Sequence, residues 1–261
     1  MTTLELVTWI AAFVMFGSFL VEALVSYFLL RDGHYGVKDT FTSVGITIGY
    51  VLVRIGLGAV IALLLVGVYA LTPLRWSMER WWHWVVLFLI NDFFYYWSHR
   101  ASHVIPWMWA SHAVHHNSAR LNLSTGLRNS WTGGVVDWIF FVPAVALGFH
   151  PLAFGAVVAV VSAWDFMTHT PYLGKIRWLD GWANSPSNHR VHHARNPRYI
   201  DKNFGSGLII WDRMFGTYAA EIEKPEIGIV EMPSRPHNPF YLQFYLWAAL
   251  IRRAFTRSTP A

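Results

Sequence analysis

Three apolar segments near the start of the chain constrain its fold more than any other feature. Leu6 to Leu30 and Val44 to Leu71 are almost free of charge, and the second holds only Arg54. Because about 20 residues of apolar helix cross the hydrocarbon core of a bilayer, both are long enough to span a membrane. Trp81 to Trp97 is interrupted by Asp92 and predicts a third span.

The overall composition agrees with lipid as the solvent. Only 13% of the 261 residues are charged, whereas soluble domains carry about a quarter. The 15 tryptophans suit the boundary between hydrocarbon and headgroups. The net charge is +5, but the basic residues stand singly beside apolar runs rather than on one polar face. We therefore expect a partner that is lipid and not nucleic acid.

Two shorter apolar runs follow, Val135 to Phe149 and Leu152 to Met167. Each is short for a complete span, so the pair predicts a hairpin that enters the membrane and returns to the same side. Phe240 to Phe255 is apolar with basic residues near its end, which is typical of a helix lying in the membrane interface. The expected fold is an all-α integral membrane protein with about three full transmembrane helices, this short hairpin, and a cytosolic helical cap.

Histidines gather in the polar sequence after these spans. The chain contains one HxxxH motif, two HxxHH motifs and a lone histidine after the predicted hairpin. Residues three or four apart lie on one face of a helix, so the imidazoles of each motif are expected to point at a common centre. The candidate metal ligands are His99, His103, His112, His115, His116, His169, His189, His192 and His193.

Packed imidazoles are costly without a metal ion, because they repel one another when protonated and lose hydration when neutral. One zinc ion takes about four ligands, so this number of imidazoles indicates two metal ions. Imidazole suits Zn, Cu, Fe and Ni, and the absence of cysteine excludes thiolate ligands from this chain. A redox metal is favoured, since the abundant substrate beside a bilayer is an unactivated C–H bond.

Two other classes of protein stay open at this point. A histidine-rich membrane metal transporter would place its histidines within the spans, facing one another. A membrane haem protein needs only two axial histidines per haem, which leaves most of the set without a role. The isolated histidines His34, His83, His150 and His237 are expected to be hydrogen-bonded residues near the interface.

The motifs and their surroundings resemble the fatty acid hydroxylase/sterol desaturase superfamily of membrane di-iron oxygenases. The resemblance covers roughly residues 81–218 and rests on residues 91–103 (NDFFYYWSHRASH), 109–128 (WASHAVHHNSARLNLSTGLR) and 186–217 (PSNHRVHHARNPRYIDKNFGSGLIIWDRMFGT). The His169-Thr170 pair and the IDKNFG stretch are most similar to the alkylglycerol monooxygenase-like branch.

The resemblance implies an O₂-dependent enzyme in which the nine histidines hold two iron ions, which zinc can replace during purification. It implies hydroxylation of a membrane lipid such as a fatty acyl chain, a sterol or an ether lipid, with desaturation as the alternative. It also implies that electrons come from outside, either from a separate redox protein such as a ferredoxin or cytochrome, or from a tetrahydropterin. Arg128 and Arg190 are candidates to bind a lipid headgroup, with a solvated or a structural role as an alternative of at least equal weight.

Three polar residues are candidates to orient the histidines. Asp92 lies seven residues before His99 and Asp165 four before His169, and a metal-bound histidine often donates its second N–H to a carboxylate. For Asp92 an ion pair with an arginine is an equal alternative. Many members of the superfamily carry a further histidine where this chain has Asn188, which we expect to cap the helix of the last motif, with a water-mediated metal contact as the alternative.

The segments together predict three regions and an orientation. Residues 1–80 hold the N-terminal transmembrane helices, residues 81–218 the fatty acid hydroxylase-like catalytic domain, and residues 219–261 a peripheral or interfacial segment. Arg31 and Lys38 place the first loop in the cytoplasm by the positive-inside rule. We expect a multi-pass protein of a bacterial inner membrane, with its active site facing the cytoplasm.

Overall fold

The computed structural model describes residues 3–257, and this range contains helices and two isolated bridges but no strand. The expectation of an all-α protein is therefore confirmed. In chain order the helices are α1 (Thr3–Leu24), which continues as η1 (Val25–Leu30), α2 (Val37–Leu71), α3 (Trp81–Val104), α4 (Pro106–His116), α5 (Leu123–Gly126), α6 (Gly133–Asp137), η2 (Trp138–Phe141), α7 (Val142–Ala146), α8 (Pro151–Met167), α9 (Pro186–His192), α10 (Ile210–Phe215) and α11 (Pro239–Arg257).

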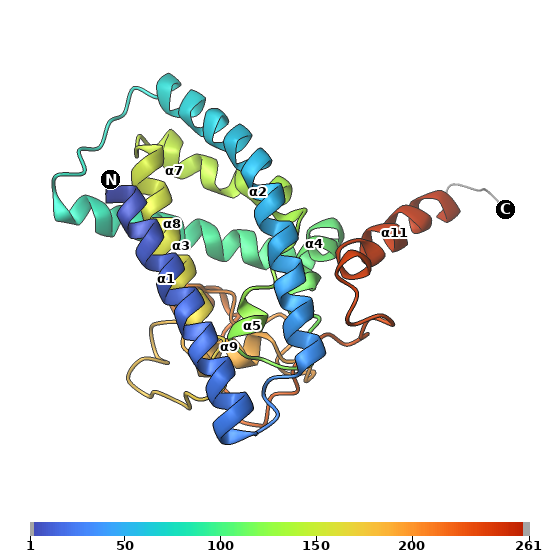
Figure 1. The fold of residues 1–261 in the computed structure, drawn as a ribbon. Coiled ribbons are helices and arrows are strands. Elements are labelled where there is room, and N and C mark those ends of the chain that lie inside the picture. The colour runs from blue at the N-terminus through green and yellow to red at the C-terminus, as the bar shows by residue number, and fades with distance from the viewer. Residues whose placement is uncertain (1–2, 258–261) are drawn as a thin grey trace.

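Among residues 3–257, two helical segments are long and apolar enough to cross a membrane, Glu5–Leu30 and Val37–Leu71. A core helix of a soluble protein would bury such a surface, but only 22% and 6% of their most apolar stretches are buried. Figure 1 shows α1 and α2 running in opposite directions, joined at the end of the molecule where α5 and α9 lie. These two helices agree with the first two predicted spans.

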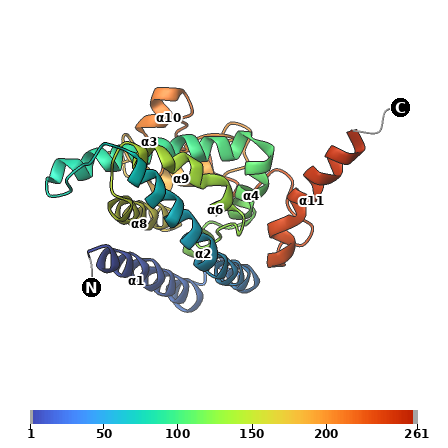
Figure 2. The same ribbon diagram turned by 90° about the horizontal axis from the view of Figure 1, so that it is seen from above.

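The third predicted span is helical but differs from the other two. α3 carries Asp92, Ser98 and several histidines, and it does not meet the same criterion of length and hydropathy. Figures 1 and 2 show α3 running across α1 and α2 rather than alongside them. The expected total of three spans thus stays a prediction.

The two apolar runs of the predicted hairpin form two packed helical arms, and its entry into the membrane stays a prediction. α6, η2 and α7 form the first arm and α8 the second. Gly148 in the turn between them has a φ of +96°, and a Cβ there would lie 2.6 Å from the backbone of Leu74. Glycine is therefore required both for the left-handed backbone and for the close approach of the loop after α2. The indole N–H of Trp76 donates to the carbonyl of Leu147 (2.8 Å) and fixes the same contact.

The remaining helices form a cap at the end where α1 and α2 are joined. α4, α5, α9 and the long loops between them build it, and α11 extends from its side (Figures 1 and 2). The first part of α11 packs on the cap, with Leu242 and Gln243 buried, and the Oε1 atom of Gln243 accepts a hydrogen bond from the backbone of Trp131 (2.8 Å). The C-terminal end of α11 exposes Ile251 and Phe255. The placement of this helix in the membrane interface stays a prediction.

Candidate metal centre

Two successive helices bring the first two histidine motifs together. α3 ends at Val104, and Pro106 starts α4 after a single extended residue, Ile105. Proline suits the first turn of a helix, because an N–H there would have no helical acceptor. The resulting corner sets His99 against His112, with their Nε2 atoms 3.0 Å apart.

The third motif lies on α9, a short helix opened by Ser185. The hydroxyl of Ser185 accepts a hydrogen bond from the backbone N–H of Asn188 (3.2 Å), so Ser185 is the N-cap and the expectation that Asn188 caps this helix is wrong. His169 follows directly after α8. Its Nε2 atom lies 3.0 Å from that of His189 and 3.1 Å from that of His115.

The nine histidines form two adjacent sets, each of which could hold a metal ion. Within each set the donor atoms lie within 4.8 Å of one another. The rings of His116 and His193 stack where the sets meet, with 4.3 Å between their centroids. We call them the five-histidine set, which is His99, His103, His112, His116 and His192, and the four-histidine set, which is His115, His169, His189 and His193.

Each HxxHH motif contributes to both sets, which corrects the expectation that one motif points at one centre. On α4, His112 and His116 belong to the five-histidine set and His115 to the other, whereas α9 sends only His192 to the five-histidine set. The reason is helical geometry, because residues four apart share a face while direct neighbours diverge by about 100°. An HxxHH motif therefore contributes imidazoles to both histidine sets.

Backbone carbonyls orient several of the rings. The Nδ1–H of His99 donates to the carbonyl of Phe204 (2.8 Å), and that of His192 to the carbonyl of Lys202 (2.9 Å). A proton held on Nδ1 leaves the lone pair of Nε2 free to bind a metal. The Nε2 atoms of His103 and His192 are buried without a hydrogen-bond partner among the described residues. Such orphaned acceptors fit a metal ion.

Burial keeps these imidazoles neutral, which is the form that binds metal. Desolvation lowers the pKa of His169 to about 4, although two backbone carbonyls oppose the shift. The pKa of each motif histidine on α4 and α9 lies well below the ordinary value, first because of desolvation and then because of neighbouring imidazoles. At neutral pH the imidazoles of the cap are therefore already in the neutral form that binds metal.

Two buried carboxylates hold the loop that orients His99. Asp92 accepts a hydrogen bond from the backbone N–H of Gly207 (2.7 Å), and Asp212 accepts one from that of Phe204 (2.8 Å). Asp92 thus acts on His99 through this loop. Its carboxylate accepts hydrogen bonds from backbone and indole N–H groups rather than from an imidazole or an arginine. Asp212 belongs to the WDRMFGT stretch, and this contact gives that stretch its role in the site.

The two other candidates also act through the backbone. The Nδ1–H of His169 donates to the carbonyl oxygen of Asp165 (3.0 Å) rather than to its carboxylate. The side-chain amide of Asn188 donates to the carbonyls of Asp180 and Ala183, at 3.1 Å each, and so ties down the loop before α9.

Asp201 is a carboxylate partner that the sequence analysis does not single out. Its Oδ1 atom lies 3.4 Å from the Nδ1 atom of His103. Asp201 and Asn203 both have left-handed backbone with a φ of +58°, which aspartate and asparagine tolerate better than other side chains. In the sequence, the Asp and the Asn two residues apart in the IDKNFG stretch were the signal that could have indicated this left-handed loop beside the histidines.

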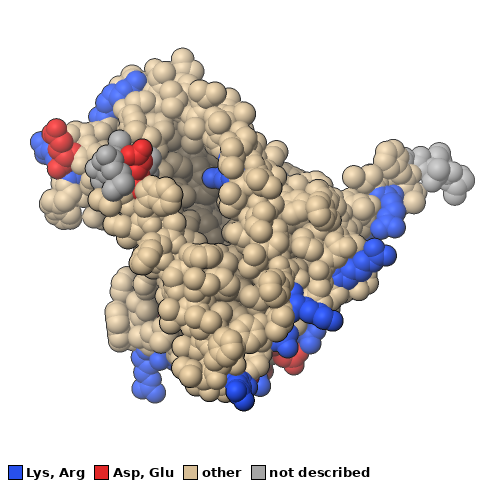
Figure 3. Space-filling model, in the orientation of Figure 1, with Lys and Arg blue, Asp and Glu red and all other residues tan. Residues whose placement is uncertain are grey.

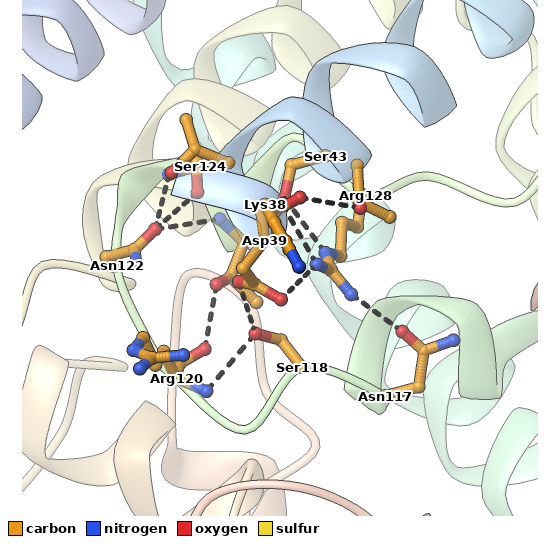
Figure 4. Close-up of polar contacts among 12 residues, drawn as sticks. Lys38, Asp39, Ser43, Asn117, Ser118, Arg120, Asn122, Ser124 and Arg128 are labelled. Atoms are coloured by element: carbon orange, nitrogen blue, oxygen red, sulfur yellow. Dashed lines mark hydrogen bonds and ion pairs between the residues drawn. The ribbon is translucent and has the colours of Figure 1, made fainter. Parts of the chain in front are cut away.

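Arg128 joins the metal centre to the membrane helices and does not bind a headgroup. Figure 4 shows its fully buried guanidinium beside the first turns of α2, where Nη2 lies 2.5 Å from Oδ1 of Asp39 and Nε donates to Ser43 (2.9 Å). A third bond goes to Asn117 (2.8 Å). The carbonyl of Arg128 in turn accepts from Nδ1 of His115 (3.3 Å). The structural alternative is therefore confirmed.

Together, the exposed apolar helices and the histidine sets describe a membrane protein whose helical cap holds two groups of imidazoles that could bind metal ions. The chain belongs to the fatty acid hydroxylase family, whose family model matches residues 84–217. This range contains all nine histidines of the two sets.

Several curated relatives carry the name alkylglycerol monooxygenase. The protein of Xenopus tropicalis is 41% identical over 175 residues, which is 67% of this chain and 38% of the relative. The human protein is 41% identical over 177 residues (68% and 39%), and that of Caenorhabditis elegans 34% identical over 246 residues (88% and 47%). The chain lies in the alkylglycerol monooxygenase-like branch and spans less than half the length of these relatives. No solved structure matches it.

Proposed function

We propose that the protein is a non-haem di-iron oxygenase that hydroxylates a membrane lipid. The observation that carries this proposal is the pair of adjacent histidine sets, built from buried neutral imidazoles. The relatives named above are monooxygenases, which supports the same reaction class. An alkylglycerol ether is the first substrate to test, because these relatives carry that name.

In this proposal each histidine set holds one iron ion. Iron supplies the O₂ chemistry that insertion of oxygen into a C–H bond requires. The protein's own contribution is orientation: the carbonyls of Phe204 and Lys202 fix the tautomers of His99 and His192. Most of these imidazoles are buried, which limits their contact with bulk water. Asp201 and the loop held by Asp212 complete this support.

The position of the histidines argues against the two other classes of protein. Neither membrane-crossing candidate, Glu5–Leu30 or Val37–Leu71, contains a histidine, which an ion relay through the membrane would need. Nε2 atoms within a set approach to 3.0 Å, as for His189 and His193, and such packing leaves no room for a porphyrin between them.

The outer surface supports a lipid substrate that enters from the bilayer. Figure 3 shows a broad uncharged band and, within it, a recess between α2 and the helices α1 and α8, with a single basic group inside. A recess at the level of the hydrocarbon suits an acyl or alkyl chain. Basic residues gather at the cap end of this face (Figure 3), which favours a cytoplasmic cap. A bacterial inner membrane stays a prediction of the sequence analysis.

Isotopic labelling tests the proposal directly. Iron-loaded protein in nanodiscs would be given an alkylglycerol, a free fatty acid and a phospholipid with ¹⁸O₂ and a chemical reductant, and the lipids would be analysed by mass spectrometry. We expect one lipid to gain one ¹⁸O atom. A product that lacks two hydrogens would instead show desaturation, and unchanged lipids in all three classes would overturn the proposal.

A further inference from the structure

A charged side chain interrupts the apolar surface of α2. Arg54 is the one charged residue between Val44 and Leu71, and its side chain is exposed. The rest of the helix, Ile55 to Leu71, covers about 25 Å at 1.5 Å per residue, which is most of the hydrocarbon core of a bilayer. With Leu71 at the far boundary, Arg54 lies about one turn inside the boundary on the cap side, where lipid headgroups meet their chains.

The described part of the protein supplies no counter-charge to Arg54. None of the ion pairs between described residues includes it, and its guanidinium lies 5.9 Å from the centre of the Tyr50 ring. Asp137 is the acidic residue of α6, but its carboxylate accepts a hydrogen bond from Ser102 instead. Because a charge within the membrane is costly without a partner, we expect the partner to come from the lipid.

The fold places Arg54 in the recess between α2 and the helices α1 and α8. The described residues of these three helices include two basic side chains, Lys38 and Arg54, and Lys38 lies in the first turn of α2 at the cap. Arg54, halfway along α2, therefore accounts for the basic group that Figure 3 shows inside the recess. Its Nη1 atom lies 3.3 Å from the position that a Cβ on Gly134 would take, so glycine there leaves space for the guanidinium.

The wall beside Arg54 continues to the histidines. Gly134 follows Gly133, where a Cβ would lie 3.8 Å from the Oγ atom of Ser111. Ser111 directly precedes His112, which belongs to the five-histidine set. Arg54 and α4 thus both border the start of α6, and a lipid held by Arg54 lies close to this set.

We propose that Arg54 binds the anionic group of a membrane lipid, a carboxylate or a phosphate, while the chain of that lipid occupies the recess. A guanidinium suits both groups, because its parallel N–H donors match two oxygens of either one. The uncharged wall of the recess suits an alkyl or acyl chain. This site goes beyond the proposed function, because it selects acidic lipids whether or not oxidation follows.

Photolabelling of iron-loaded protein under argon tests this site. Maltoside micelles are the medium, because they contain neither phosphate nor carboxylate. Three probes share one alkyl chain with a diazirine and differ in the head, which is a free carboxylic acid, a lysophosphatidate or an alcohol. The concentration of each probe that gives half-maximal labelling of α2 and α6 peptides would be measured.

The variants separate the charge of Arg54 from other effects. Arg54→Gln removes the charge, Arg54→Lys keeps it, and Asp137→Asn asks whether the acid on α6 is the true partner. Arg253→Gln is the matched control, because Arg253 is exposed on α11 and its loss removes the same charge from another part of the surface. Iron content would be measured for each variant to confirm that the cap is intact.

We expect at least one acidic probe to label the wild type at a concentration at least about tenfold lower than the alcohol does, which is the scale of one charge-assisted hydrogen bond. Arg54→Lys, Asp137→Asn and Arg253→Gln should keep most of this preference, and Arg54→Gln should lose it. Preference for the acid alone identifies a carboxylate as the partner, and preference for the lysophosphatidate alone a phosphate.

Equal labelling of the wild type by all three probes would overturn the site. A preference that persists in Arg54→Gln, or that Asp137→Asn abolishes as completely, would do the same. The proposed function is tested apart from this: dithionite-reduced wild type that oxidises no lipid on admission of O₂ would refute that function and leave the lipid site standing.

Discussion

The membrane helices and the cap differ in the environment of their side chains. α2 exposes most of its apolar surface, and residues such as Ile55 are 71% exposed. In the cap, polar groups are buried and bonded to one another, as with His169, Asn203 and Asp212. The membrane helices therefore depend on lipid for their burial, whereas the histidine sets depend on a hydrogen-bonded protein shell.

A buried ion pair joins the two regions. Arg128 belongs to the cap and Asp39 to α2, and they lie 89 residues apart in the chain. Because the carbonyl of Arg128 also accepts from His115, the position of α2 is coupled to the four-histidine set. Changes in either region can therefore be ranked by how far they disturb the cap.

Loss of a metal ligand should have the largest effect. His115→Ala and His192→Ala each remove one ligand from one set, and we expect iron content and lipid oxidation to fall at least about tenfold, the range in which even an outer partner of a ligand acts. The variants should still insert into membranes, because the spans are untouched. His237→Ala, an exposed histidine outside both sets, is the control. Full activity in either ligand variant would remove these histidines from the centre.

Loss of the connecting ion pair should come next. Arg128→Ala leaves Asp39 buried without its partner, and we expect the free energy of unfolding in detergent to fall by about 3–5 kcal/mol. Arg190→Ala breaks the more exposed pair with Glu221 and should cost clearly less. Unfolding monitored by tryptophan fluorescence gives both values. Equal losses would mean that Arg128 does not join the two regions.

The cap should be sensitive to acid in a way that the spans are not. Unfolded imidazoles protonate near pH 6.5, while in the folded cap the pKa of His169 is about 4. Unfolding therefore takes up protons below pH 6.5. The stability of metal-free protein should be fully present above that pH and fall towards pH 4, by about 1.4 kcal/mol per pH unit for each such histidine.

Denaturant midpoints of metal-free protein at pH 7.5, 6.0 and 5.0 measure this loss. The helical signal of α1 and α2, which contain no histidine, serves as the internal control. Midpoints that do not change with pH would show that the imidazoles are not desolvated.

Truncation of a lipid-facing side chain should have the smallest effect. Ile55→Ala on α2 should change the free energy of unfolding by about 0.5 kcal/mol or less, because the side chain makes few contacts in the protein. Leu87→Ala removes a fully buried side chain of α3 and should cost about 2–5 kcal/mol. Thermal unfolding in the same detergent compares the pair, and an equal cost would contradict the exposure of α2.

The sequence predicted the apolar helices well, and the errors have a physical cause. The first span was expected from Leu6 to Leu30 and runs from Glu5 to Leu30, but the second was expected from Val44 and begins at Val37. Its first turns contain Lys38 and Asp39, which have the composition of a loop. Asp39 is helical because Arg128 neutralises it from a distant part of the chain, a contact that no local pattern reveals.

The nine histidines that the sequence selects lie together in the structure, but their arrangement was not predicted. The helical spacing of the histidines selects eight of them, because a shared face follows from local geometry, whereas His169 stands alone and was included for its place after the hairpin and for the resemblance to the family. The division of each HxxHH motif between two sets depends on how α3, α4, α8 and α9 pack. The supporting contacts of Asp201 and Asp212 run through loops, whose course is set by tertiary hydrogen bonds and not by sequence period.

The central claim is that the two histidine sets hold two metal ions, and metal content per chain tests it most directly. Iron, zinc and copper would be determined by mass spectrometry on freshly purified protein, with a visible spectrum of the same sample. We expect close to two non-haem metal ions per chain. One ion, none, or the absorption band of a haem would contradict it.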